Sequence, residues 1–260
     1  MTAQPSTLAS AISAALANQK QRDALTFQHI SELAELARGV NEEIITFLAD
    51  QAAIPDERLY VTVQLLRASF DHARALLFLV QTNPRDMGAS SLALHRAQVE
   101  SFLRAMFFGF IASQEQLDDF LENDEGVRAR TDRGRWRNIG VKELATIVEP
   151  RINELSDGEI DSPEKLSRMV QNAWDPLCGF VHGGKAIRAC YMDTHGQIGC
   201  DLPPSVLFQV VCNCFAVTNF GFLSALARIY DLPGILQDSP LSQAMERFIN
   251  RQRQLVVLDR

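Results

Sequence analysis

Three charged residues, Arg96, Glu100 and Arg104, follow one another at intervals of four in an otherwise apolar segment, SLALHRAQVESFLRAMFFGFIA. On an α-helix this spacing places them along one side. Apolar residues occupy nearly every other direction, which is the pattern of a buried helix. A lone buried charge is costly, so these charges must be paired or must face a polar cavity. We therefore take this row as the first candidate site.

The segment before it carries its own polar side, with Arg67, Asp71 and Arg74 in LLRASFDHARALLFLV. A short turn, TNPRD, joins the two segments, so we expect them to be antiparallel neighbours. Arg67 and Asp71 are then expected to mesh with Glu100 and its flanking arginines. A buried ion-pair network that sets helix register is the favoured interpretation. A pocket for an anionic ligand stays open, because arginine forks suit phosphate and carboxylate.

His182 stands at a predicted helix end beside two glycines, in WDPLCGFVHGG. A protonated histidine is stabilised at the carboxyl end of a helix, so His182 can be a simple cap. It can also act as an acid or base if a carboxylate such as Glu100 or Asp175 lies beside it. His182 and Glu100 are therefore the candidate catalytic residues, and Asp175 joins the arginines as a candidate ligand-binding residue.

An Arg-x3-Glu-x3-Arg helix followed by a helix that ends in Val-His-Gly resembles a group of uncharacterised bacterial all-helical proteins, similar to the HEPN-like and abortive-infection proteins. The matching residues are Arg96, Glu100, Arg104, His182 and Gly183. The resemblance implies a bacterial protein of stress or phage defence that recognises RNA or another phosphate-bearing ligand. HEPN ribonucleases carry an arginine four to six residues before the histidine, where this chain has cysteine, leucine and proline. Enzyme activity is therefore left open, and the alternative is a non-enzymatic helical interaction or ligand-binding module.

One basic segment, residues 124–140, is predicted to be a surface loop. Its candidate nucleic-acid-binding residues are Arg128, Arg130, Arg133, Arg135, Trp136 and Arg137. Arginine beside an aromatic ring suits a nucleic-acid strand. Acidic residues lie just upstream, and charge pairing on a surface loop explains both runs, which is the interpretation we favour.

The composition is that of an ordinary globular domain, with 47% hydrophobic and 22% charged residues in 260. A formal net charge of -7 disfavours general binding to a nucleic-acid backbone. The five cysteines form no CxxC pair and the histidines are scattered, so we expect no metal, no cofactor and reduced thiols in the cytoplasm. Residues 205–227 are uncharged and long enough to cross a bilayer, but polar residues interrupt them. We expect a core helix there, no membrane partner, and a homodimer.

Helical periodicity dominates the chain and predicts an all-α bundle in a single domain, residues 1–260, with residues 1–22 peripheral. Helices are expected at residues 8–19, 23–53, 57–81, 89–112, 113–123, 141–155, 162–182, 205–230 and 239–255. Ile187, Ala189 and Tyr191 alternate with other side chains before a DTHG turn. This alternation predicts one small β-hairpin at residues 186–201.

Overall fold

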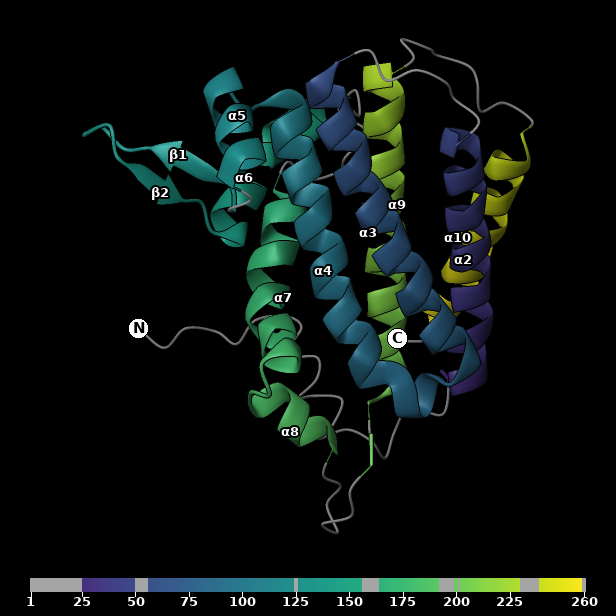
Figure 1. Ribbon diagram of the computed structural model, residues 1–260. Coiled ribbons are helices and arrows are strands. Elements are labelled where there is room, and N and C mark those ends of the chain that lie inside the picture. The colour runs from purple at the N-terminus through teal and green to yellow at the C-terminus, as the bar shows by residue number, and fades with distance from the viewer. Residues whose placement is uncertain are drawn as a thin grey trace.

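The computed structural model describes residues 25–49, 56–123, 126–155, 164–191, 199–200, 202–229 and 239–258. Over these residues the fold is a helical bundle with one small antiparallel sheet (Figure 1), which confirms the predicted fold class. The helices are α2 (Phe27–Ala49), α3 (Glu57–Thr82), α4 (Pro84–Phe110), α5 (Gln114–Asn123), α6 (Val141–Leu155), α7 (Lys165–Val181), α8 (Lys185–Tyr191), α9 (Pro204–Ile229) and α10 (Pro240–Leu258). The strands are β1 (Arg128–Arg130) and β2 (Trp136–Asn138).

A single residue, Asn83, separates the two central helices. Its backbone N–H donates to Leu79 O at 3.0 Å and closes α3. Its side chain accepts from the backbone N–H of Asp86 at 3.2 Å and opens α4. Pro84 occupies the first turn, where no backbone donor is needed. Helix α4 therefore begins several residues before position 89, where the apolar periodicity alone had placed its start.

Helices α3 and α4 form the central antiparallel pair, as the short turn predicts (Figure 1). Helix α2 packs on α3, and α10 packs on α2; helices α6 and α7 pack against α4, while α9 contacts α2, α3 and α4. A glycine allows the central pair to approach closely. A Cβ added at Gly109 would lie 2.9 Å from Thr62 Cγ2. The core between these helices is aromatic-rich, and its largest buried rings are Phe70, Phe102, Phe108, Phe222 and Phe248.

A buried polar cluster ties α4 to α9 at the centre of the bundle. The amide nitrogen of Gln98 donates to Cys214 O at 3.0 Å and to Thr218 Oγ1 at 3.2 Å. His95 Nδ1 lies 2.9 Å from Gln98 Oε1, and the Ser69 hydroxyl donates to Gln98 O at 3.0 Å. Burial lowers the pKa of His95 and raises that of the Cys214 thiol. Both side chains are therefore uncharged core groups at neutral pH.

The apolar helix predicted near residues 205–230 is α9. Among the described helices, it alone is long and apolar enough to cross a membrane, over Pro204–Leu226. Within the bundle, 61% of its most apolar stretch is buried against other helices.

The predicted position of the β-hairpin is wrong. Residues 185–191 form helix α8, and residues 192–198 and 201 lie outside the described part of the chain. Lysine, alanine and arginine in KAIRACY favour a helix, and two-residue alternation over so short a segment does not exclude one. The hairpin instead pairs β1 with β2, in the segment predicted to be a loop. Its turn is closed by Gly134, which has φ +72° and donates to Thr131 O at 2.8 Å.

Three further predictions fall on residues that are not described. These are the peripheral position of residues 1–22, the helix at residues 8–19 and the helix start at residue 162. The remaining predicted helices are confirmed, with ends that differ by a few residues where those ends are described.

Candidate functional site

The charged row of α4 pairs with itself. Arg104 Nη2 lies 2.6 Å from Glu100 Oε1, and Arg96 Nη2 lies 3.7 Å from Glu100 Oε2. The three side chains are half-buried, with 22% of Glu100 exposed. The guanidinium carbon of Arg96 lies 5.0 Å from the ring centre of Trp174 in α7. Glu100 thus hydrogen-bonds Arg104 and lies at ion-pair distance from Arg96, whose guanidinium also contacts the indole ring. The Nε atom of Arg96 is buried and has no hydrogen-bond partner among the described residues.

The row of α3 faces α2 instead. Asp71 accepts from Arg67 Nε at 3.0 Å and lies 2.9 Å from Arg74 Nη2, while Arg74 reaches Glu42 of α2 at 3.8 Å. No ion pair between described residues joins α3 to α4. The predicted meshing of the two charged rows is therefore wrong. The contact between the helices is made by apolar side chains, the Ser69–Gln98 hydrogen bond and a hydrogen bond from Arg58 to Phe108 O at 2.8 Å, so each charged row faces a different neighbour.

His182 is the C-cap residue of α7, and its ring is exposed. Its backbone N–H donates to Cys178 O at 2.9 Å. Helices α4 and α7 run antiparallel (Figure 1), and Arg96 of α4 contacts Trp174 of α7. Glu100 follows Arg96 by four residues and His182 follows Trp174 by eight, so the two residues lie on opposite sides of that contact. At a rise of about 1.5 Å per residue, their backbones are separated by roughly 18 Å along the bundle. The structure does not bring the two candidate catalytic residues together.

Asp175, the other carboxylate considered for His182, turns to α6. Its carboxylate lies 2.8 Å from Lys142 Nζ, and its side chain is 76% exposed. No hydrogen bond or ion pair within the described residues joins His182 to Asp175 or to Glu100. Among the described residues, neither carboxylate is therefore within hydrogen-bonding reach of His182, as an acid–base pair would require.

The arginines of the basic segment lie on the hairpin, which projects from the bundle beside α5 and α6 (Figure 1). Three of them pair with helix carboxylates: Arg128 Nε with Asp119 at 2.8 Å, Arg130 Nε with Glu115 at 3.1 Å, and Arg137 Nη1 with Glu143 at 2.8 Å. Hydrogen bonds from arginine lower the pKa of Asp119 and of Glu143. Arg133 and Arg135 are exposed near the tip. Charge pairing therefore explains most of this segment, as the favoured interpretation expects.

Trp136 belongs to the same surface but is covered by cations. The guanidinium carbon of Arg130 lies 4.3 Å from its ring centre, and that of Arg128 lies 5.5 Å away. These two guanidinium groups compete with a base for the ring, so charge pairing and cation–π contact account for the indole without a nucleic-acid ligand.

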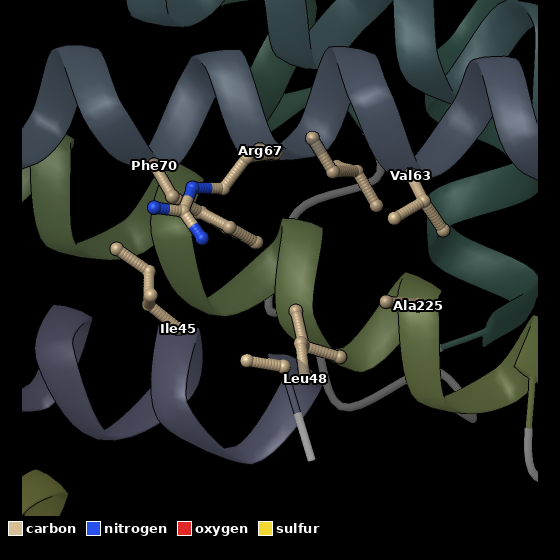
Figure 2. Close-up of a pocket in the computed structure, with 8 residues that line it drawn as sticks. Ile45, Leu48, Val63, Arg67, Phe70 and Ala225 are labelled. Carbon is tan, nitrogen blue, oxygen red and sulfur yellow. The ribbon is translucent and has the colours of Figure 1, made fainter. Parts of the chain in front are cut away.

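Arg67 also lines a cavity, which its position in the sequence did not reveal. It lies at the mouth of an apolar cavity between α2, α3 and α9, which we name the Arg67 cavity (Figure 2). The cavity has a volume of about 150 Å³. It is lined by Ile45, Leu48, Ala49, Val63, Leu66, Arg67, Phe70 and Ala225. Arg67 was selected from the charge pattern, whereas the apolar lining carries the same sequence signal as any core residue.

A second cavity of similar size, about 170 Å³, lies between α6, α7 and α9. We name it the Glu149 cavity. Its lining residues are Glu149, Ile152, Asn153, Lys165, Leu166, Met169, Asn213, Ala216, Val217 and Phe220. Its wall thus combines apolar side chains with a carboxylate, an ammonium group and two amides.

Glu149 itself was missed by the sequence reasoning. It is 5% exposed and accepts from the backbone N–H groups of Leu166 at 2.6 Å and Ser167 at 3.2 Å, and from the Ser167 hydroxyl. It therefore caps the amino end of α7 from a different helix, where a negative charge is stabilised by the helix dipole. The residue at the N-cap position, Glu164, makes no capping hydrogen bond with its side chain.

No group of three or more histidine, cysteine, aspartate or glutamate side chains suited to a metal ion occurs among the described residues. The fold and its contacts define an all-helical bundle whose charged rows pair locally and which holds an apolar cavity under an arginine. Residues 66–234, more than half of the chain, match the family of unknown function DUF6988, so the protein belongs to that family. No curated protein and no solved structure gives a significant match.

Proposed function

We propose that this protein is a non-enzymatic ligand-binding module in which the Arg96–Glu100–Arg104 row has a structural role. The observation that carries the proposal is the closure of that row on itself. Both arginines share the Glu100 carboxylate, and Arg96 also stacks on Trp174. An incoming phosphate would have to compete with the half-buried Glu100 carboxylate, which hydrogen-bonds one nitrogen of Arg104 and lies 3.7 Å from one nitrogen of Arg96.

The position of His182 supports the same proposal. An acid–base group must lie within hydrogen-bonding reach of the groups that it serves. His182 is exposed at the end of α7, beyond the level at which Arg96 contacts Trp174. Among the described residues, the groups that the resemblance to HEPN-like proteins singles out are not assembled into one site, which supports a non-enzymatic role. The Arg67 cavity favours small-molecule binding over a purely protein-binding role.

The catalytic part of the proposal is tested by incubating purified protein with mixed RNA at low salt. The wild type and a His182→Ala/Arg96→Ala variant are compared side by side. We expect no cleavage by either protein. Cleavage by the wild type that the double variant loses would overturn the proposal and restore the ribonuclease hypothesis.

The structural part is tested by the stability of a Glu100→Ala variant. Removal of the shared carboxylate leaves two half-buried arginines unpaired, and we expect the free energy of unfolding to fall by about 1–2 kcal/mol. Glu43→Ala is the matched control, because Glu43 is an exposed carboxylate on α2. Its replacement should change stability by less than about 0.5 kcal/mol. Equal effects of the two substitutions in urea denaturation would contradict a structural role for Glu100.

A further inference from the structure

We propose that the Arg67 cavity binds an amphipathic carboxylate, a molecule with one anionic head and an apolar body of about six carbon atoms. This inference rests on the proposed ligand-binding function and names the class of ligand. Short-chain and medium-chain fatty acids and phenylalkanoic acids belong to that class.

The walls of the cavity set the nature of the ligand's body. Three helices contribute them, with Ile45 and Leu48 from α2, Phe70 from α3 and Ala225 from α9 (Figure 2). Among the described lining residues, Arg67 alone is charged or polar. Dry apolar cavities of about 150 Å³ lined by leucine, isoleucine and phenylalanine accommodate a benzene molecule. The volume here therefore suits a six-carbon chain or a phenyl ring.

Arg67 sets the nature of the ligand's head. Its Nε donates to Asp71 Oδ2 at 3.0 Å, and it makes no other hydrogen bond with the described residues. A guanidinium group has five N–H donors, so the edge formed by its Nη groups can donate to a second carboxylate. Figure 2 shows this guanidinium between α3 and α2, beside the labelled apolar side chains. A ligand can thus place its body among those side chains and its carboxylate on Arg67.

The neighbouring Asp71 restricts the charge of that head. Asp71 already shares its carboxylate between Arg67 and Arg74. A second negative group beside it is repelled, and a dianionic phosphate is repelled more strongly than a carboxylate. A singly charged head group is therefore the best match for the Nη donors of Arg67 that Asp71 leaves available.

The Glu149 cavity makes a useful comparison because it has a similar volume. The buried carboxylate of Glu149 forms part of its wall. An anionic ligand is disfavoured beside that carboxylate, even though the exposed Lys165 lies at the rim. An amphipathic carboxylate should accordingly select the Arg67 cavity.

The two cavities can be distinguished by methyl NMR, because Ile45 lines one and Ile152 lines the other. The full chain is labelled at its isoleucine methyl groups and titrated with butanoate, hexanoate, octanoate and the neutral control hexanol. We expect hexanoate to shift the Ile45 signal and leave the Ile152 signal in place. Affinity should rise about fourfold for each methylene that enters the cavity.

Three substitutions test the role of Arg67. Arg67→Gln should weaken hexanoate binding about fivefold to tenfold and leave hexanol binding within about twofold. Asp71→Asn should strengthen hexanoate binding, because it releases the guanidinium from a competing carboxylate. Arg74→Gln is the matched control, since Arg74 contacts Asp71 but does not line the cavity, and it should change binding by less than about twofold.

Ala225→Leu fills the cavity and should abolish binding of both hexanoate and hexanol, with an unchanged Ile152 signal as the check on folding. The proposal is overturned if hexanoate shifts Ile152 instead of Ile45, if it shifts neither signal at millimolar concentration, or if Arg67→Gln binds it as the wild type does. Failure of hexanoate binding in a protein that cleaves no RNA would remove this ligand class and leave the non-enzymatic assignment standing. RNA cleavage that depends on His182 and Arg96 would remove the proposed function itself.

Discussion

Replacement of Glu149 by alanine should lower the free energy of unfolding by about 2–4 kcal/mol. The carboxylate accepts hydrogen bonds from two backbone N–H groups, at Leu166 and Ser167, and from the Ser167 hydroxyl. Loss of a capping side chain costs about 1 kcal/mol, and each buried donor left unpaired costs about 1–3 kcal/mol. The adjoining Glu149 cavity admits water to these donors in the variant, so the expected total lies below the full sum.

Urea denaturation measures this loss, and hydrogen exchange at the amides of Leu166 and Ser167 locates it. Glu149→Gln keeps one acceptor oxygen and should cost about 1 kcal/mol, because the charge at the helix end is removed. Glu164→Ala is the matched control, since Glu164 holds the N-cap position without a capping bond, and it should cost less than about 0.5 kcal/mol. A Glu149→Ala variant that loses less than about 1 kcal/mol, or that unfolds no more easily than Glu164→Ala, would refute the assignment of Glu149 as the cap of α7.

Two further predictions concern the core. The pKa of His95 is lowered from 6.5 chiefly by burial, with the Gln98 hydrogen bond opposing the shift, so on acidification the unfolded chain takes up this proton before the folded protein does. The free energy of unfolding should therefore fall as the pH drops below about 6.5, by at most about 1.4 kcal/mol per pH unit. Urea denaturation of His95→Gln should show a smaller fall over the same pH range. An equal pH dependence of the two proteins would count against a neutral buried His95. Gly109→Ala would place a methyl group 2.9 Å from Thr62 Cγ2 and should cost about 1–3 kcal/mol. The same substitution should cost less in a Thr62→Ala background, and a double-mutant cycle that shows no coupling would contradict the close contact.

Much of the secondary structure was predictable because its causes are local. Asn83 and Pro84 mark a helix boundary through bonds within a few residues, and the apolar periodicity of α3, α4 and α9 is written in consecutive turns. The hairpin was misplaced because alternation over a few residues is weak evidence for a strand. Its true position depends on a turn at Gly134 and on side chains of α5 and α6 that pair with its arginines.

The candidate site was likewise predictable where its causes are local and unpredictable where they depend on packing. The spacing of Arg96, Glu100 and Arg104 predicted charges on one side of a helix that are paired or face a polar cavity, with the row of α3 as the expected partner. The structure shows pairing within α4 instead. The spacing could not show which neighbour the row would face. A helical period defines a side of the helix, but the rotation of that side is settled by packing against other helices.

The sequence by itself determined an all-α chain, the antiparallel pair α3 and α4, and the presence of charged rows that need partners. These properties follow from local propensity, short connections and the cost of leaving a charge unpaired. Only the tertiary structure decided that Arg67 covers an apolar cavity and that Glu149 caps α7. Both features join residues from helices far apart in the chain, and no local pattern encodes the space or the hydrogen bonds that form when those helices meet.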